Sequence, residues 1–336
     1  MDDARRSRDA VRSQGRWSRS EGHTPRGTEA DGPVPLTFAV VGAPKAGTTS
    51  LAAYLADHPH VFMTDPKEPY FFGSDLAPLR RRGGIDDLED YRRLFRRFDQ
   101  TRHLAAGEAS THYLSSPDAL QQLLEMRPGA RLIVLVRDPV EMAWSFFHQQ
   151  RRHQLEPRTD FAAAWRDSVR GVPVEVPTLV PRLLRYDQVV KLGQQLEQLS
   201  RVCPREQLFV TSLDQLAGDP RGTYRAVLAF IGVPDDGRES FDVENAAVVP
   251  RSQLAYRLML SRPGRVASRR VKAAVGAGGR HALRHVRARA LERPAGGQEL
   301  SDDLAAEIRS DLHADLQLLS RLWPTVSTQP RPAWLA

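Results

Sequence analysis

The sequence predicts an α/β protein, in which a parallel sheet of the P-loop type is flanked by helices. Two observations carry this prediction. Short apolar runs of strand length alternate along the chain with longer stretches of helical pattern, which is typical of parallel sheets covered by helices. The first apolar run, residues 38–41, also passes through a glycine-bearing turn directly into a helical stretch. Such a turn is a common binding place for phosphate groups.

The predicted elements follow one another without an internal repeat. The helix after the opening strand is expected to end at His58-Pro59. Prolines on both sides of residues 67–68 then exclude a regular helix and predict a constrained loop over residues 65–73. Further strands are expected at residues 60–64, 103–108, 131–136 and 207–211. Further helices are expected at residues 88–98, 117–126, 139–152, 160–169, 186–201 and 220–231.

The helix at residues 139–152 has the clearest start signal. Asp138 suits the N-cap position and Pro139 the first helical position. Glu141 falls three residues after Asp138, as in a capping box. The strand that precedes this helix is the most hydrophobic of the chain.

Composition divides the chain into a tail and one domain. Residues 1–34 are rich in Arg, Ser, Asp and Gly and almost free of apolar side chains, which predicts a disordered tail. Residues 35–325 are expected to form a single domain. Within it, residues 262–295 are dense in Arg, His, Ala and Gly and predict a basic, partly exposed segment. Residues 301–322 carry an apolar stripe at helical spacing and predict a C-terminal helix.

Charge and cysteine content narrow the classes of function. The 336 residues carry a formal net charge of +7, which suits anionic ligands, anionic surfaces or nucleic acid. A single cysteine, Cys203, excludes an internal disulfide and a cysteine-based zinc site. No apolar run reaches the length of a membrane-spanning helix, and no apolar leader follows the arginines at residues 5–6. We therefore expect a cytoplasmic protein that needs no metal.

A phosphate-binding signal follows the first strand. Backbone N–H groups, the dipole at the start of a helix and the charge of Lys45 together make an anion cradle there. In the P-loop of ATP- and GTP-binding proteins the lysine follows the second glycine, whereas here Lys45 precedes Gly47. This order favours phosphate binding but argues against an ordinary kinase or GTPase.

Arg137 is the second candidate for binding an anion. It stands at the carboxyl end of the strand at residues 131–136, and open α/β sheets bind their ligands at that end of the strands. Ser145 follows eight residues later, so two helical turns can bring its hydroxyl group to the same phosphate. A surface arginine and a solvent-facing serine are the alternative.

Three blocks, in order, resemble the sulfotransferases that depend on 3′-phosphoadenylyl sulfate (PAPS), of the heparan-sulfate and bacterial carbohydrate type. The run GAPKAGTTS is similar to the 5′-phosphosulfate loop of that family. The run LIVLVRDPVEMAWSFFHQ is similar to its 3′-phosphate element. The stretch from YDQVVKLG to AFIGV resembles its later core. The resemblance runs over residues 38–233, more faintly to residue 321, and implies the sulfotransferase fold.

This resemblance implies that PAPS is the sulfuryl donor and 3′,5′-ADP the nucleotide product, without a metal. Arg251 occupies the place of a basic loop that closes over the nucleotide in the family, with an ordinary linker arginine as the alternative. The other donor-binding residues implied are Lys45, Ala46, Gly47, Thr48, Thr49, Ser50, Arg137 and Ser145.

Two residues are candidates for the general base. Glu68 precedes a Phe-Phe pair by three residues, similar to the catalytic glutamate of the carbohydrate sulfotransferases; a loop glutamate paired with Lys67 is the alternative. His112 occupies a place comparable to the histidine base of the small-molecule sulfotransferases. Its surroundings resemble the carbohydrate type, except that Ala109 and Thr111 replace a lysine and a proline. We favour Glu68, and a structural role for His112 stays open.

The predicted reaction moves the sulfuryl group of PAPS to a hydroxyl or amine of a glycan, glycolipid or natural product. A P-loop nucleotide kinase or ATPase is the first alternative, and the order of Lys45 and Gly47 argues against it. A protein that binds anionic polymers is the second. Much of the excess positive charge falls in residues 1–34 and 262–295, outside the core. We therefore expect no nucleic-acid partner, and at most a peripheral contact with an acidic membrane surface.

Overall fold

The structure is a computed structural model that describes residues 33–173, 180–242, 248–250, 292–294 and 300–335. The chain divides into two units, Met1–Pro33 and Val34–Ala336, and every element below belongs to the second. The predicted tail lies almost wholly outside the described residues. The basic segment at residues 262–295 also lies outside them, apart from one short strand.

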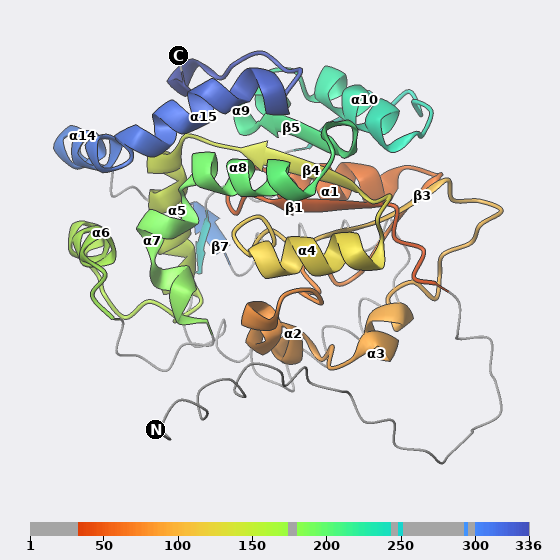
Figure 1. Ribbon diagram of the computed structural model, residues 1–336, viewed down its shortest axis with the longest axis horizontal. Coiled ribbons are helices and arrows are strands. Elements are labelled where there is room, and N and C mark those ends of the chain that lie inside the picture. The colour runs from red at the N-terminus through yellow and green to blue at the C-terminus, as the bar shows by residue number, and fades with distance from the viewer. Residues whose placement is uncertain (1–32, 174–179, 243–247, 251–291, 295–299, 336) are drawn as a thin grey trace, which may run out of the picture. The chain divides into compact units, whose positions relative to one another are not determined.

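A five-stranded parallel sheet lies at the centre of this unit (Figure 1). Its strand order is β2-β3-β1-β4-β5, and every neighbouring pair runs parallel. The predicted parallel α/β fold is therefore confirmed. The strands are β1 (Phe38–Gly42), β2 (Val61–Met63), β3 (Ala105–Ala109), β4 (Arg131–Val136) and β5 (Leu208–Ser212).

Helices cover both faces of the sheet. The chain moves from β1 toward one edge through α1 (Thr48–Asp57) and from β3 toward the other edge through α4 (Pro117–Met126). Right-handed crossovers therefore place these two helices on opposite faces. Figure 1 shows α4 and α8 (Leu192–Val202) in front of the sheet and α1 behind it. β1, β3 and β5 are buried along their whole length, as expected for strands covered on both faces.

The remaining elements surround this core. A separate antiparallel pair joins β6 (Val248–Pro250) to β7 (Glu292–Pro294). Short 3₁₀ turns lie at Ser74–Leu76, Pro181–Leu184, Arg205–Gln207 and Ala333–Leu335. The other helices are α2 (Ala77–Gly83), α3 (Leu88–Arg93), α5 (Pro139–Arg152), α6 (Phe161–Arg170), α7 (Tyr186–Val189), α9 (Leu213–Gly218), α10 (Pro220–Ile231), α14 (Asp302–Asp311) and α15 (His313–Val326).

Three predicted helices differ from the observed ones. The helix expected at residues 88–98 ends already at Arg93 and continues as turns. The helix expected at residues 186–201 is broken into α7 and α8, because the Asp315 carboxylate accepts hydrogen bonds from the N–H groups of Gly193 and Gln194, both at 2.9 Å, and so caps a new helix start. The C-terminal helix expected at residues 301–322 is two helices, which divide at Leu312.

The start of α5 corrects one detail of capping. Asp138 is the N-cap as predicted, since its Oδ1 accepts hydrogen bonds from the N–H groups of Val140 at 2.8 Å and Glu141 at 3.4 Å. The predicted capping box is wrong. The Glu141 carboxylate instead accepts hydrogen bonds from the guanidinium of Arg137, at 3.2 Å and 2.9 Å. The charged guanidinium of Arg137 thus binds the Glu141 side chain, which in a capping box would accept a hydrogen bond from the backbone N–H of Asp138.

Candidate active site

The loop between β1 and α1 is shaped to leave N–H groups exposed to an anion. Lys45 and Gly47 both have positive φ angles, 65° and 85°. A Cβ atom on Gly47 would lie 2.8 Å from Leu213 Cδ1, so the loop needs glycine there. No side chain caps the start of α1. The first N–H groups of this helix therefore remain for a ligand, at the positive end of the helix dipole.

Arg137 lies against this loop. It follows the last residue of β4, and its Nη1 donates a hydrogen bond to the backbone oxygen of Lys45 at 3.2 Å. The next residue, Asp138, contacts Arg309 of α14 through a hydrogen bond of 2.5 Å. The structure thus brings together two anion-binding candidates that lie 92 residues apart in the sequence. Ser145 is partly exposed on α5, and its part in binding the same ligand stays a prediction.

Lys45 has an unusual protonation equilibrium. Burial, together with the charges of Arg152, Arg137 and Lys67, lowers the pKa of its ammonium group to about 8. Glu68 acts in the opposite direction. An ammonium that is crowded by other cations loses its proton more readily, and a bound anion would reverse this effect. The surroundings of Lys45 are therefore suited to receiving negative charge.

Glu68 lies beside the same loop on a constrained turn. It has a positive φ angle of 64°, and its backbone N–H donates to the oxygen of Ala109 at 2.9 Å. This bond holds the turn against the carboxyl end of β3. Glu68 Oε1 accepts hydrogen bonds from Lys67 Nζ at 3.2 Å and Thr111 Oγ1 at 3.1 Å. The structure thus places the carboxylate at the edge of the sheet where Lys45 and Arg137 also lie.

Glu68 is ionised at neutral pH. Burial acts to raise the pKa of its carboxyl, but the charge of Lys67, the neighbouring His112 and the hydrogen bonds from Lys67 and Tyr70 outweigh it. The pKa therefore lies below its ordinary value of 4.5. The side chain is 38% exposed, so a substrate hydroxyl can approach it. An ionised and accessible carboxylate is what a general base requires.

His112 has the opposite character. It is only 6% exposed and packs between the rings of Tyr70, at 5.7 Å, and Phe146, at 5.6 Å. Burial lowers the pKa of its imidazole to about 4, with Arg182 and Lys67 adding to this effect and Glu68 opposing it. The ring is therefore neutral at physiological pH. Its packing supports a structural role beside Glu68 and favours Glu68 as the base.

A buried carboxyl group, Glu108, organises the interior beneath this turn. It has no exposed surface. Its oxygens accept hydrogen bonds from Tyr91 Oη at 2.8 Å, Ser110 Oγ at 2.9 Å and Tyr113 Oη at 3.4 Å. A polar group buried this deeply is tolerated only when it is hydrogen-bonded, and here three hydroxyl groups meet that need.

The partners of Glu108 hold the turn that carries Glu68. Ser110 Oγ accepts a hydrogen bond from the backbone N–H of Tyr70 at 3.2 Å. Tyr113 Oη accepts one from the backbone N–H of Phe72, also at 3.2 Å. The position of the candidate base therefore depends on a carboxyl group that has no exposed surface. The sequence showed Glu108 only as part of an expected strand, so its function in the site was missed.

We expect Glu108→Gln to change how stability depends on pH. Burial raises the pKa of the Glu108 carboxyl to about 7 from an ordinary 4.5. The folded state thus keeps a proton that the unfolded state releases, and the carboxyl lowers stability as pH rises through this window. Glutamine has no such proton. The unfolding free energy of the variant relative to the parent should therefore rise by about 2 to 3 kcal/mol between pH 5 and pH 8.

Urea unfolding of both proteins at the two pH values measures this difference. Glu197→Gln on α8 is the control, since Glu197 is 38% exposed and pairs with Arg201 at the surface. Its unfolding free energy should keep a constant offset from the parent. Equal offsets for Glu108→Gln at pH 5 and pH 8 would contradict the prediction.

Comparison with known proteins identifies the family. The model of the sulfotransferase family (Sulfotransfer_3) matches residues 37–237, more than half of the chain. The chain belongs to the sulfotransferase family. The matched region contains the phosphate loop, the turn of Glu68 and Arg137, so all three lie inside the part that defines this membership.

Two curated relatives illustrate the similarity of this sulfotransferase to others. Membrane-associated sulfotransferase kil1 of Dictyostelium discoideum is 33% identical over 165 residues, which cover 48% of this chain and 33% of kil1. Heparan sulfate glucosamine 3-O-sulfotransferase 3B1 of Mus musculus is 27% identical over 194 residues, covering 58% of this chain and 45% of the mouse protein. The chain thus matches less than half the length of either relative.

A solved structure supports the fold of this sulfotransferase. The crystal structure of a sulfotransferase from Alicyclobacillus acidocaldarius aligns with a TM-score of 0.62 and 23% identity. The alignment covers 90% of this chain and 99% of the other. At this level of identity the likeness concerns the fold alone.

Two residues near Lys45, Arg152 and His153, were missed from the sequence. Arg152 is the last residue of α5, and its charge is the largest one acting on Lys45. His153 follows it; burial lowers the pKa of its imidazole to about 4, and the charges of Arg152 and Arg82 add to this effect. The sequence did contain a signal for them, since a run of basic residues ends α5, the helix that follows Arg137.

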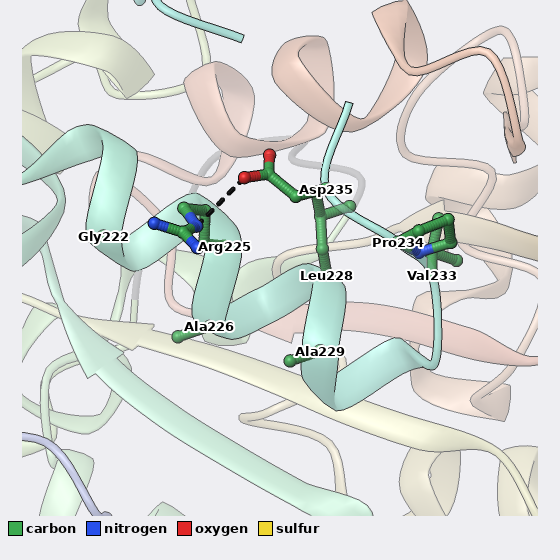
Figure 2. Close-up of a pocket in the computed structure, with 8 residues that line it drawn as sticks. All are labelled: Gly222, Arg225, Ala226, Leu228, Ala229, Val233, Pro234 and Asp235. Carbon is green, nitrogen blue, oxygen red and sulfur yellow. Dashed lines mark ion pairs between the residues drawn. The ribbon is translucent and has the colours of Figure 1, made fainter. Parts of the chain in front are cut away.

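The pocket in Figure 2 is separate from this cluster. It lies between α10 and the segment after it, where Arg225 Nε and Asp235 Oδ2 form an ion pair at 3.0 Å. Its other lining residues are Gly222, Ala226, Leu228, Ala229, Val233 and Pro234. None of the candidate catalytic residues lines it. We assign no chemistry to this pocket.

Two further observations concern the described residues alone. Within them, no group of three or more His, Cys, Asp or Glu side chains is arranged to hold a metal ion. No helix among them is long and apolar enough to span a membrane. Arg251 lies outside the described residues, so its proposed contact with a nucleotide has no structural account.

Proposed function

We propose that the chain transfers the sulfuryl group of PAPS to a hydroxyl or amine group of an acceptor. One observation carries this proposal beyond family membership. An ionised carboxylate, Glu68, and the uncapped start of α1 are joined through one side chain, since Lys67 Nζ hydrogen-bonds both Glu68 Oε1 and Thr48 Oγ1. A base and an anion cradle are thus held side by side, as a transfer between two oxygen atoms requires.

The proposed step is an in-line displacement. Glu68 accepts the proton of the acceptor group while the acceptor oxygen or nitrogen forms a bond to sulfur. The bond between sulfur and the 5′-phosphate oxygen breaks, and its electron pair stays on that oxygen. Lys45 and the first N–H groups of α1 stabilise the negative charge that develops there. Stabilisation of this charge is the larger contribution, as in phosphoryl transfer.

The other donor contacts follow from the same arrangement. Arg137 at the end of β4 is proposed to bind the 3′-phosphate, together with Ser145 on α5. Arg137 already donates to the Lys45 backbone oxygen, so one guanidinium can link the two phosphate-binding regions. The residues proposed to bind the 5′ end are Lys45, Ala46, Gly47, Thr48, Thr49 and Ser50.

The acceptor is proposed to be acidic. The charge of Arg152 acts on both Lys45 and His153, and the charge of Arg82 acts on His153. Positively charged side chains near Lys45 favour a negatively charged substrate. The mouse relative is named for a heparan sulfate substrate, so an acidic glycan is the first acceptor to test. A cytoplasmic location remains a prediction; kil1 is named a membrane-associated protein.

Donor binding tests the proposal directly. Calorimetry should show binding of PAPS and of 3′,5′-ADP to the purified chain, and no comparable binding of ATP. Radiolabelled PAPS incubated with acidic glycans should give sulfated product together with 3′,5′-ADP. A folded protein that binds neither nucleotide would overturn the proposal, and tight ATP binding with Mg²⁺ would favour the kinase alternative instead.

We expect the affinity for PAPS to fall with rising pH. The ammonium of Lys45 has a pKa of about 8 in the free protein, and a bound phosphate requires its protonated form. The dissociation constant should therefore rise about tenfold per pH unit above pH 8. Calorimetry at pH 7, 8 and 9 measures this slope. Lys45→Arg keeps its charge over the whole range, so a slope that persists in this variant would assign the effect to another group.

A further inference from the structure

Lys67 lies between the two halves of the proposed site. Its Nζ atom is 3.2 Å from Glu68 Oε1 and 3.5 Å from Thr48 Oγ1. Thr48 is the first residue of α1, so the ammonium stands at the opening of the anion cradle. The side chain is 25% exposed. One cation thus contacts both the candidate base and the place where the donor would bind.

Glu68 does not depend on Lys67 for its position. Thr111 Oγ1 donates to the same carboxylate oxygen at 3.1 Å, and the backbone N–H of Glu68 is held by Ala109 at 2.9 Å. The network below the turn holds Tyr70 and Phe72 through their backbone N–H groups. The ion pair between Lys67 and Glu68 is therefore additional to an already fixed turn.

The contact of Lys67 with Thr48 is weak. A distance of 3.5 Å is at the limit of a hydrogen bond, and a hydroxyl oxygen is a neutral acceptor. An ammonium group has three donors and forms its strongest hydrogen bonds with anionic oxygens. An anionic oxygen placed above Thr48 would therefore compete successfully for Lys67. Lysine suits such an exchange because its charge is compact and its stem is flexible.

We propose that Lys67 binds the sulfuryl group of the donor while that group is transferred; this inference rests on the proposed function. Lys45 then stabilises charge on the leaving phosphate oxygen, whereas Lys67 faces the oxygens of the sulfuryl group itself. Because Lys67 also contacts Glu68, the sulfuryl group is held next to the base that receives the acceptor proton. One lysine thus acts on each side of the bond that breaks: Lys45 on the phosphate side and Lys67 on the sulfuryl side.

The pair PAPS and 3′,5′-ADP separates this function from general electrostatics. Near neutral pH both nucleotides carry about two negative charges at the 5′ end. In 3′,5′-ADP both are on the terminal phosphate, whose second pKa is about 6, whereas in PAPS one is on the phosphate and one on the sulfuryl group. Only PAPS has the sulfuryl group. A residue that binds this group should affect PAPS selectively, whereas a residue that only adds positive potential should affect both nucleotides.

Calorimetry with Lys67→Met tests the inference. We expect the affinity for PAPS to fall by about tenfold or more, as for the loss of a hydrogen bond to a charged group. The affinity for 3′,5′-ADP should change less than about threefold, because Lys67 lies further from the charges of that nucleotide. Lys67→Arg should recover part of the PAPS affinity. Lys191→Met is the matched control, because Lys191 is also 25% exposed and pairs with a carboxylate, Asp187. It should bind both nucleotides like the parent.

Other outcomes would overturn the inference. Equal losses of affinity for PAPS and 3′,5′-ADP would mean that Lys67 contributes only general positive charge. Unchanged affinity for both would mean that Lys67 does no more than pair with Glu68. If Lys67→Met does not fold, as judged by thermal unfolding, Lys67→Gln carries the same comparison. Failure of the unchanged chain to bind either nucleotide would instead refute the proposed function, so the two failures are distinguishable.

Discussion

Replacing Lys45 by methionine is expected to lower sulfuryl transfer by about a thousandfold, the loss seen when a preorganised donor to a developing negative charge is removed. Lys45 stands in a loop whose helix start no side chain caps, and burial together with the nearby arginines lowers the pKa of its ammonium to about 8. No other ammonium lies within the loop itself. The rate of 3′,5′-ADP release with an acceptor present measures this effect.

Two further variants make the Lys45 result specific. Lys45→Arg should keep donor binding but recover only part of the rate, because a planar guanidinium does not place its charge where an ammonium does. Lys191→Met, which removes a lysine far from the loop in sequence, should retain the parental rate. Turnover of Lys45→Met above about a tenth of the parental value would mean that the loop has another function, since a lost general electrostatic effect costs far more than that.

Glu68→Gln is expected to lower kcat by about a hundredfold to ten-thousandfold, the usual contribution of a general base. The amide keeps the size of the side chain and can still accept hydrogen bonds from Lys67 and Thr111, which now contact the carboxylate. PAPS affinity should therefore change little. Single-turnover measurements with saturating donor separate this loss from any loss of binding.

A matched control and a rival variant accompany Glu68→Gln. Glu197 is equally exposed, at 38%, and also pairs with a cation, so Glu197→Gln should have the parental rate. His112→Gln tests the competing base. If it loses as much activity as Glu68→Gln while its thermal stability stays parental, then His112 and not Glu68 accepts the proton.

Much of the fold could be predicted because its signals are local. The observed bounds of α4, α10 and β4 coincide with the predicted ones. Each of the two helices begins with a proline preceded by a residue that caps it, Ser116 or Asp219. The break between α7 and α8 could not be predicted in this way. It depends on the Asp315 carboxylate, more than a hundred residues away in the sequence.

Short helices were harder to predict for a different reason. α9 has only six residues, too few for a hydrophobic period to show. Its start nevertheless carries a complete capping box, formed by Ser212 and Gln215, and this signal was present in the sequence. α2 likewise has a proline in its first turn, and it is followed by Gly84, a C-cap residue in the left-handed conformation. Terminal signals would have found both helices where periodicity could not.

The candidate site divides along similar lines. Lys45 and Arg137 follow parallel strands, and topology alone places the carboxyl ends of neighbouring parallel strands together. Arg152 was missed, because its approach to Lys45 depends on how the far end of α5 packs. Glu108 was missed because a buried carboxyl group is recognised by its partners, and Tyr91 and Tyr113 reach it only in the folded chain.

The contact between Asp138 and Arg309 has a consequence for the order in which the protein is made. Asp138 adjoins Arg137 and begins α5, yet its partner lies in α14, close to the end of the chain. During synthesis the ribosome releases the phosphate loop and Arg137 long before α14 emerges. The carboxylate beside Arg137 therefore gains its partner only after a further 171 residues have been synthesised. A message cut short after α10 would encode both phosphate-binding regions without this late support.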